Sequence, residues 1–336
     1  MSETLNDLDP RLPAAKMHLA MPNQPVKGRV TTSESCLNGK SASFVRHVCI
    51  DVSGTVLEGN FLPGQSFGVI PPGLDPRGRP HKLRLYSIAC PSWGEDGAGR
   101  VVSTTPKRLL AEHHPQTATD DPGDHSLFRG VCSNYLCDLR PGDEVLLTGP
   151  AGKRFLLPED PNAHDYLFLA TGTGIAPFRG MLLDLLEGPP PGPRRAAWPG
   201  PCRSRIHLVM GTAYGTDLLY HGLLKQLAAT NQNFTYHPVL SREPLPQPGY
   251  GPHVHHYLAT RIGEFSSFLS SNRTLVYICG LAGMQLGLFR ALGVHGLASG
   301  YLRVDERIRD RAPIDWTDDD LRRYIRPTHR CMQEVY

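Results

Sequence analysis

Short apolar runs separated by turn residues characterise the first half of the chain. Between residues 28 and 158, runs rich in β-branched and aromatic residues recur at intervals of roughly 8 to 15 residues. They lie at 43–52, 65–70, 83–89, 100–103 and 144–148. Sequences with strong turn preferences separate them, among them LPGQ at 62–65 and RPGDE at 140–144. This spacing predicts an antiparallel β-barrel.

After residue 158 the pattern changes to an apolar strand, a glycine-containing turn and an amphipathic helix. Three such units follow one another, with strands at 166–170, 206–211 and 275–279 and helices at 177–186, 218–229 and 283–292. Continuous apolar strands that alternate with helices are typical of a parallel sheet covered by helices. A further helix is predicted at 316–325, with Asp315 as its N-cap.

The 336 residues amount to about twice the length of a typical domain. We expect a mobile N-terminal arm at 1–25, a β-barrel domain at 26–158 and an α/β domain at 159–336. Nine of the fourteen residues at 188–201 are Pro or Gly, which predicts an inserted surface loop. A solvent-exposed spacer is favoured there over a polyproline recognition motif.

The chain has 35 basic and 32 acidic side chains, a net charge of +3 and 40% hydrophobic residues. This balance is typical of a soluble globular protein and argues against nucleic-acid binding through bulk charge. No apolar stretch approaches the ~20 residues needed to cross a bilayer, and the acidic N-terminus is unlike a signal peptide. Eight scattered cysteines without a CxxC pair predict reduced thiols and no metal site. We therefore expect a cytoplasmic monomer without a membrane span.

The most specific local signal is YLFLATGTGIAP at 166–177. A buried strand runs into Gly172 and Gly174, and a helix with Pro177 in its first turn follows. Glycines let the backbone approach a phosphate, and a helix N-terminus offers free N–H groups. The segment is predicted to bind a pyrophosphate, although it departs from the GxGxxG of the Rossmann motif. A plain tight turn between strand and helix is the alternative.

Two further segments carry candidate chemistry. Arg84, Tyr86 and Ser87 end a predicted barrel strand, and the small residues at 130–133 lie downstream. An arginine grips a pyrophosphate through two hydrogen bonds and a tyrosine lies flat on an aromatic ring, so together they predict a flavin dinucleotide cradle. The strand at 276–279 delivers Cys279 to the carboxyl edge of the parallel sheet, where ligands bind. A lone cysteine there is more often core than catalyst.

Taken in order, these segments resemble the plant-type ferredoxin–NADP(+) reductase family over nearly the whole chain, from about residue 26 to 336. The matching motifs are RLYS (84–87), PKRL (106–109), RGVCSNYLCDL (129–139), LTGPAGK (147–153), TGTGIAPFRG (171–180), LSRE (240–243), VYICGLAGM (276–284) and the final EVY. Residues 70–89 are additionally similar to the reductase component of the benzoyl-CoA epoxidase system. The resemblance implies an antiparallel FAD barrel at 26–158 followed by an α/β NADP-binding domain at 159–336.

The resemblance also implies three sets of site residues. The FAD set is Arg84, Leu85, Tyr86, Ser87, Gly130, Val131, Cys132, Ser133 and Tyr336, with Tyr86 and Tyr336 on opposite faces of the flavin. The NADP(H) set is Lys107, Gly172, Thr173, Gly174, Pro177, Ser241, Arg242, Tyr257, Gly280 and Met284. The catalytic set is Ser87, Cys279, Glu334 and Tyr336. Arg242 suits the 2′-phosphate of NADP(H), whereas the neighbouring Glu243 would suit the ribose of NAD.

This chain departs from the family pattern at several positions. Ala111 replaces an aromatic residue that often follows KRL and stacks on the FAD adenine, which predicts looser FAD binding. Ala170 replaces a glycine before TGTG. Ala259 and Ala282 stand where Gln and Lys are frequent, which affects details of NADP(H) affinity.

The resemblance implies electron exchange with a small redox protein, either ferredoxin or flavodoxin. Basic residues that would form a rim attractive to an acidic partner are Arg77, Arg79, His81, Lys82, Lys153 and Arg154. Ordinary surface charge is the alternative for these residues. Two other functions stay open. A reductase component dedicated to an oxygenase would share every motif, whereas a non-catalytic flavin-binding protein would not need the whole catalytic set.

Overall fold

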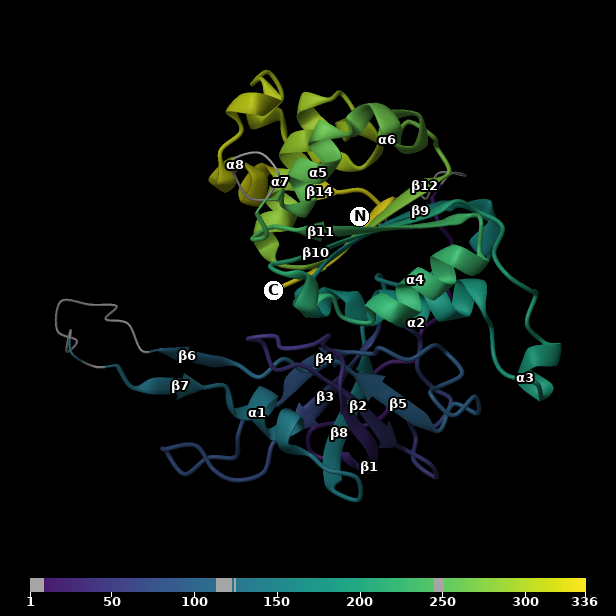
Figure 1. Ribbon diagram of the computed structural model, residues 1–336, viewed down its shortest axis with the longest axis vertical. Helices are drawn as coiled ribbons and strands as arrows, with labels where there is room; N and C mark the ends of the chain where they lie inside the picture. The colour runs from purple at the N-terminus through teal and green to yellow at the C-terminus, as the bar shows by residue number, and fades with distance from the viewer. Residues whose placement is uncertain (1–8, 113–122, 124, 245–250) are drawn as a thin grey trace.

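The computed structural model describes residues 9–112, 123, 125–244 and 251–336. An antiparallel β domain and an α/β domain with a parallel sheet are stacked on each other (Figure 1). The predicted fold class is confirmed. Within the described residues, every helix is too short or too polar to cross a membrane.

Six strands form the antiparallel sheet of the first domain, in the order β4-β3-β8-β1-β2-β5. Their bounds are β1 Val26–Ser35, β2 Arg46–Asp51, β3 Ser66–Ile70, β4 Arg84–Ser87, β5 Val101–Thr104 and β8 Glu144–Ala151. The edge strands meet, because Ala89, beyond β4, donates its backbone N–H to the carbonyl of Ser103 in β5 at 2.8 Å. The sheet therefore curls into the predicted barrel. Its interior is apolar and contains Ile50, Phe67 and Leu147.

A two-stranded ribbon and a helix complete this domain. Strand β6 (Leu110–Glu112) pairs with β7 (Leu127–Arg129), and the ribbon extends away from the barrel (Figure 1). Helix α1 (Val131–Asp138) starts directly after β7. Residues 131–133, which belong to the expected FAD set, form the first turn of α1. The reason is that Cys132 and Leu136, one turn apart, both pack into the barrel core.

Five parallel strands form the sheet of the second domain, in the order β11-β10-β9-β12-β15. Their bounds are β9 Asp165–Thr171, β10 Ile206–Thr212, β11 Phe234–Leu240, β12 Thr274–Gly280 and β15 Cys331–Val335. Helices α2 (Ile175–Leu186) and α4 (His221–Thr230) cover the face toward the barrel (Figure 1). The other face is covered by α5 (Val254–Thr260), α6 (Ile262–Leu269), α7 (Ala282–Val294) and α8 (Asp318–Tyr324).

The end of the chain differs from the predicted pattern in two ways. Thr317, not Asp315, caps α8, because its hydroxyl accepts a hydrogen bond from Asp320 N while the Asp320 carboxylate accepts one from Thr317 N. A threonine with an acidic residue three positions later is a reciprocal cap. Residues 331–335 form the unpredicted strand β15 beside β12. Between these elements, β13 (Leu302–Val304) pairs with β14 (Ile325–Pro327).

The expected mobile arm at 1–25 is packed on the barrel over residues 9–25, and residues 1–8 lie outside the described residues. Ala20 is buried and exchanges backbone hydrogen bonds with Gly149. The side chain of Gln65 donates to Lys16 O at 2.9 Å. These pairings, together with the burial of Ala20, are the physical reason why residues 9–25 are ordered.

The Pro- and Gly-rich insertion at 188–201 contains the short helix α3 (Pro193–Ala196) and is largely exposed. Its Trp198 folds back onto the end of α2, where the indole N–H donates to Asp184 O at 3.2 Å. Arg195 stacks over the Trp198 ring at 4.5 Å. The insertion is therefore anchored to the end of α2 through Trp198 and through Arg195, which donates to Glu187 O at 2.5 Å.

A buried ion pair joins the two domains. Arg179 of α2 donates to both carboxylate oxygens of Glu95 in the barrel domain, at 2.6 and 3.0 Å. Ser103 and His47 also contact this carboxylate, and His47 in turn bonds the hydroxyl of Tyr220, which precedes α4, at 2.8 Å. Burial opposes ionisation of Glu95, but the hydrogen bond from His47 and the charge of Arg179 outweigh it and lower its pKa to about 2.

The same cluster contains three groups that often bind metals. Ligand atoms of His47, Cys49 and Glu95 lie within 4.8 Å of one another. The guanidinium of Arg179 is already bonded to the Glu95 carboxylate, and its positive charge repels a cation. The cluster therefore suits an ion pair between domains better than a metal.

We predict that Arg179→Met lowers the free energy of unfolding by about 3–5 kcal/mol, because it leaves the Glu95 carboxylate buried without its partner. The double variant Arg179→Met/Glu95→Gln should lose clearly less, since no unpaired charge remains. Urea unfolding of both variants measures the difference. Equal losses would show that the ion pair does not set the cost.

Candidate functional site

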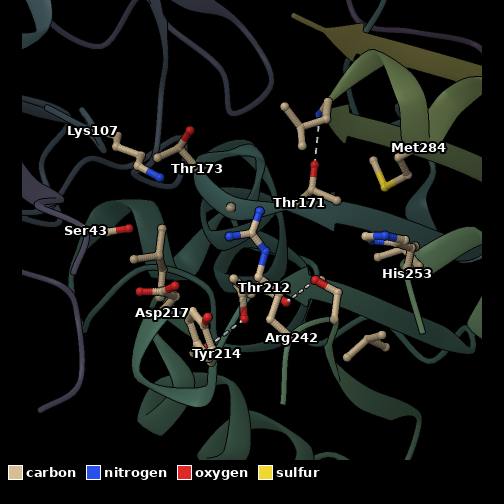
Figure 2. Close-up of a pocket in the computed structure, with 18 of the residues that line it drawn as sticks. Ser43, Lys107, Thr171, Thr173, Thr212, Tyr214, Asp217, Arg242, His253 and Met284 are labelled. Carbon is tan, nitrogen blue, oxygen red and sulfur yellow. Dashed lines mark hydrogen bonds between the residues drawn. The ribbon is translucent and has the colours of Figure 1, made fainter. Parts of the chain in front are cut away.

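A cavity of about 820 Å³ opens where the parallel strands end, within the size range of small-molecule sites. Both domains line it, with Ser43 and Lys107 from the barrel domain and Thr173 and Arg242 from the α/β domain (Figure 2). The chain leaves β9 toward the barrel-side helix α2 and leaves the adjacent β12 toward α7 on the opposite face. Ligands bind at such a switch point, at the carboxyl ends of the strands.

The turn after β9 brings backbone groups and the Thr173 side chain to the cavity. Gly172 has a φ of +54°, a conformation that glycine adopts readily. A Cβ on Gly174 would lie 2.1 Å from Cys279 O, so only glycine allows the turn to touch β12 this closely. The 3-10 turn at Gly172–Gly174 has no side-chain cap, so its N–H groups are open to an anion, whereas Ile175 N at the start of α2 already donates to Gly172 O and Thr173 O.

The opposite wall is formed by Ser241 and Arg242 after β11. Ser241 donates its backbone N–H and its hydroxyl to Thr212 O, and Arg242 N donates to Ala213 O at 2.9 Å. The guanidinium of Arg242 points into the cavity (Figure 2) and forms no ion pair with the described residues. Glu243 accepts a hydrogen bond from Gly215 N at 2.6 Å, which engages its carboxylate with the backbone.

The structure separates the expected NADP(H) set into two groups. The residues that line the cavity are Lys107, Gly172, Thr173, Ser241, Arg242 and Met284. Of the others, Gly174, Pro177 and Gly280 support the turn from behind, since Pro177 is buried as the third residue of α2 and a Cβ on Gly280 would lie 2.1 Å from Thr171 Oγ1. Tyr257 also lies outside the lining. Its hydroxyl bonds Arg261 and His237.

Several lining residues were not expected from the sequence, including Thr171, Thr212, Tyr214 and His253 (Figure 2). Thr171 and Thr212 directly follow predicted strands. The sequence alone could therefore have placed them at the carboxyl edge of the sheet, where ligands bind. Thr171 accepts a hydrogen bond from Leu281 N at 2.8 Å and so joins the ends of β9 and β12. His253 lies directly before α5, and no feature of the sequence around it predicted a place in the cavity.

Part of the catalytic set meets at the edge of the sheet. Cys279 and Glu334 face each other in register in β12 and β15. Burial, and then the nearby Glu334 charge, raise the pKa of the Cys279 thiol, which therefore stays protonated at neutral pH. Burial also raises the pKa of Glu334. Ser87 lies in the other domain, at the end of β4.

Tyr336 contacts the phosphate-binding turn. Its hydroxyl bonds Thr173 Oγ1 at 2.7 Å, and its backbone N–H donates to Gly280 O at 3.0 Å. The side chain is nevertheless 64% exposed. An exposed ring held by one side-chain hydrogen bond can be displaced at little cost.

The expected flavin cradle is assembled from β4 and the start of α1. Tyr86 of β4 is half-buried beside Cys132, and burial raises the pKa of its phenol, which stays neutral. Arg84 and Leu85 are exposed. Helix α1 has no side-chain cap, so the N–H groups at 131–133 are open to a phosphate, and Arg84 adds positive charge on the same surface. This donor set fits a flavin dinucleotide.

A barrel with such a cradle, joined to a parallel sheet with an open glycine turn at its carboxyl edge, is the architecture expected of a two-domain oxidoreductase that binds two dinucleotides. Residues 168–288 match the model of the oxidoreductase NAD-binding domain family. The ferredoxin–NADP reductase of the Cyanophora paradoxa cyanelle is 37% identical over 84% of this chain and 73% of its own length. That of a Spirulina species is 32% identical over 95% of this chain and 98% of its own length.

Solved structures agree on the fold. The Plasmodium falciparum ferredoxin–NADP+ reductase with 2′P-AMP has a TM-score of 0.66 at 20% identity, over 95% of this chain and 99% of that one. The chain belongs to the ferredoxin–NADP reductase family. It is accordingly an FAD- and NADP(H)-dependent oxidoreductase.

We predict that Gly174→Ala destabilises the protein by about 1–3 kcal/mol, the usual cost of overpacking, because the new methyl group would collide with the backbone of Cys279 and Gly280. NADP⁺ binding should weaken as the turn moves. Gly222→Ala is the matched control, since a Cβ there meets nothing within 4 Å and the residue lies outside the cavity lining. Thermal unfolding and NADP⁺ titration compare the two variants, and equal behaviour would contradict the close-approach role of Gly174.

Proposed function

We propose that the protein exchanges a hydride with NADP(H) at the cavity and single electrons with ferredoxin, or with a flavodoxin in its place, at the exposed side of the flavin cradle. When bound, FAD supplies the conversion between two-electron and one-electron transfer. The single observation that carries the proposal is the guanidinium of Arg242, which faces the phosphate-binding turn across one cavity.

Two groups of residues would bind the two phosphate-bearing parts of NADP(H). The Gly172–Gly174 turn and Lys107 would hold the pyrophosphate, and Arg242 with Ser241 would hold the 2′-phosphate. Because Gly215 N engages the Glu243 carboxylate, Glu243 does not compete for the ribose in this arrangement. These features favour NADP(H) over NAD(H).

Binding of the nicotinamide end of NADP(H) requires the ring of Tyr336 to move. The hydrogen bond of Tyr336 to Thr173 must break for the ring to move, while the backbone pairing with Gly280 keeps the chain in place. Cys279 presents a neutral thiol, and Glu334 holds its proton to higher pH than an exposed glutamate does. We assign Cys279, Glu334 and Ser87 to the positioning of the reacting rings.

A basic surface beside the cradle supports an acidic protein partner. Lys153 and Arg154 are exposed and follow β8, whose Ala151 is paired through Ser66 of β3 with Ser87 of β4. Neither Lys153 nor Arg154 forms an ion pair with any other described residue. Arg79 contributes less, because it is bonded to Asp75 at 2.8 Å. The named relatives act with ferredoxin, which is the partner we propose here.

Arg242→Ala is expected to raise the KM for NADPH roughly 10- to 150-fold, because a hydrogen bond to a charged group contributes about 1.5–3 kcal/mol. The KM for NADH should change little, since NADH lacks the 2′-phosphate. Steady-state reduction of a small dye with each cofactor measures both constants. Arg140→Ala, an exposed arginine outside the cavity, is the control. A parallel loss with both cofactors would refute the assignment of Arg242.

Lys153→Glu/Arg154→Glu is expected to slow electron transfer with ferredoxin and to flatten its dependence on salt, because the reversed charges no longer attract an acidic partner. Reduction of a neutral dye should stay nearly unchanged. Lys225→Glu/Arg322→Glu makes the same change in net charge at exposed positions elsewhere. If the control slows ferredoxin equally, net charge and not a docking surface is responsible.

A further inference from the structure

The ribbon of β6 and β7 exposes one aromatic side chain on a face that leads to the flavin cradle. Ala111 of β6 pairs with Phe128 of β7, and Gly130 N continues the pairing by donating to Leu109 O at 3.0 Å. Because side chains alternate along a strand, Leu109, Ala111 and Phe128 share one face. Phe128 is 56% exposed and Leu109 is 49% exposed.

The base of the ribbon is fastened to the first turn of α1. Leu109 N donates to Ser133 Oγ at 3.2 Å, and the Asn134 amide donates to Leu109 O at 2.9 Å and to Gly130 O at 2.8 Å. The apolar face of the ribbon therefore has a defined position relative to the open N–H groups of α1. Phe128 stands two residues before Gly130, or about 7 Å along an extended strand.

We propose that Phe128 is the surface on which the adenine of FAD stacks. The inference rests on the proposed FAD site at the start of α1. A pyrophosphate held by those N–H groups leaves the adenosine half of the dinucleotide beside the ribbon, and an exposed aromatic ring stacks readily on a base.

The register explains why Ala111 is small in this chain. The aromatic residue frequent after KRL in related sequences would stand at position 111, directly opposite Phe128. Here the ring is on the neighbouring strand, and the methyl group of Ala111 leaves room beside it. The looser FAD binding expected from Ala111 alone is therefore compensated by Phe128.

The test compares two flavins on the apoprotein by titration calorimetry. FMN carries the flavin ring and one phosphate but no adenosine. Phe128→Ala should weaken FAD about 5- to 150-fold, the range found for base stacking on aromatic side chains, and leave FMN unchanged. Phe128→Trp should retain FAD affinity. Leu127→Ala, an exposed residue on the opposite face of the same ribbon, should match the wild type.

A second variant places the ring on the other strand. Ala111→Tyr in the Phe128→Ala background should restore FAD affinity. The proposal is overturned if Phe128→Ala weakens FMN as much as FAD. It is also overturned if FAD affinity is unchanged while reduction of ferredoxin slows, because Phe128 would then contact the protein partner. Failure of the wild-type apoprotein to bind FAD would instead overturn the proposed function itself.

Discussion

The largely buried ion pair between Arg179 and Glu95 joins the two domains, and the site depends on how the domains are joined. Hydrogen bonds such as those of Ser92 with Asp184 and Thr105 with Tyr220 also join them. The cavity is lined from both sides, so its shape follows the angle between barrel and sheet. Arg179 belongs to the first turns of α2, which directly follows the Gly172–Gly174 turn. The contact between the domains and the turn proposed to bind the pyrophosphate are therefore only a few residues apart. A shift at the interface would move the turn directly.

Polar groups at the carboxyl edge of the sheet are held mainly by the backbone. Ser241 and Arg242 are pinned through Thr212 and Ala213, and Thr171 joins β9 to β12. Glu243, which by residue type favoured NAD, is satisfied by Gly215 N. The backbone has thus already engaged the Glu243 carboxylate, whereas the Arg242 guanidinium remains available to a ligand. The cavity therefore favours a ligand that carries negative charge. Residue type alone favoured NADP(H) through Arg242 but left Glu243 as an argument for NAD(H).

Sequence patterns predicted the elements whose burial is continuous and some that are only partly buried, such as β4 and α4, but they missed the partly buried strand β1. Strands β9 and β12 and helix α2 are almost wholly buried, whereas only three of the ten residues of β1 are buried. Within the site, Thr173 and Arg242 stand in continuous motifs and were predicted. Tyr257 lies outside the cavity lining and His253 lies within it, and neither position could be predicted because both depend on how α5 packs over the strands. The cap at Thr317 was missed because Asp315, two residues earlier, has an equally suitable side chain.

The position of β8 has a consequence for how the barrel is made. In the order β4-β3-β8-β1-β2-β5, the last long strand of the domain along the chain lies between two groups of earlier strands. A chain synthesised only to residue 143 would hold the pair β3-β4 and the trio β1-β2-β5 without the strand between them. Such separated pieces expose unpaired edges, which are prone to association. By contrast, each strand of the parallel sheet adds to an edge that is already free, so that domain grows outward from β9 in the order of synthesis.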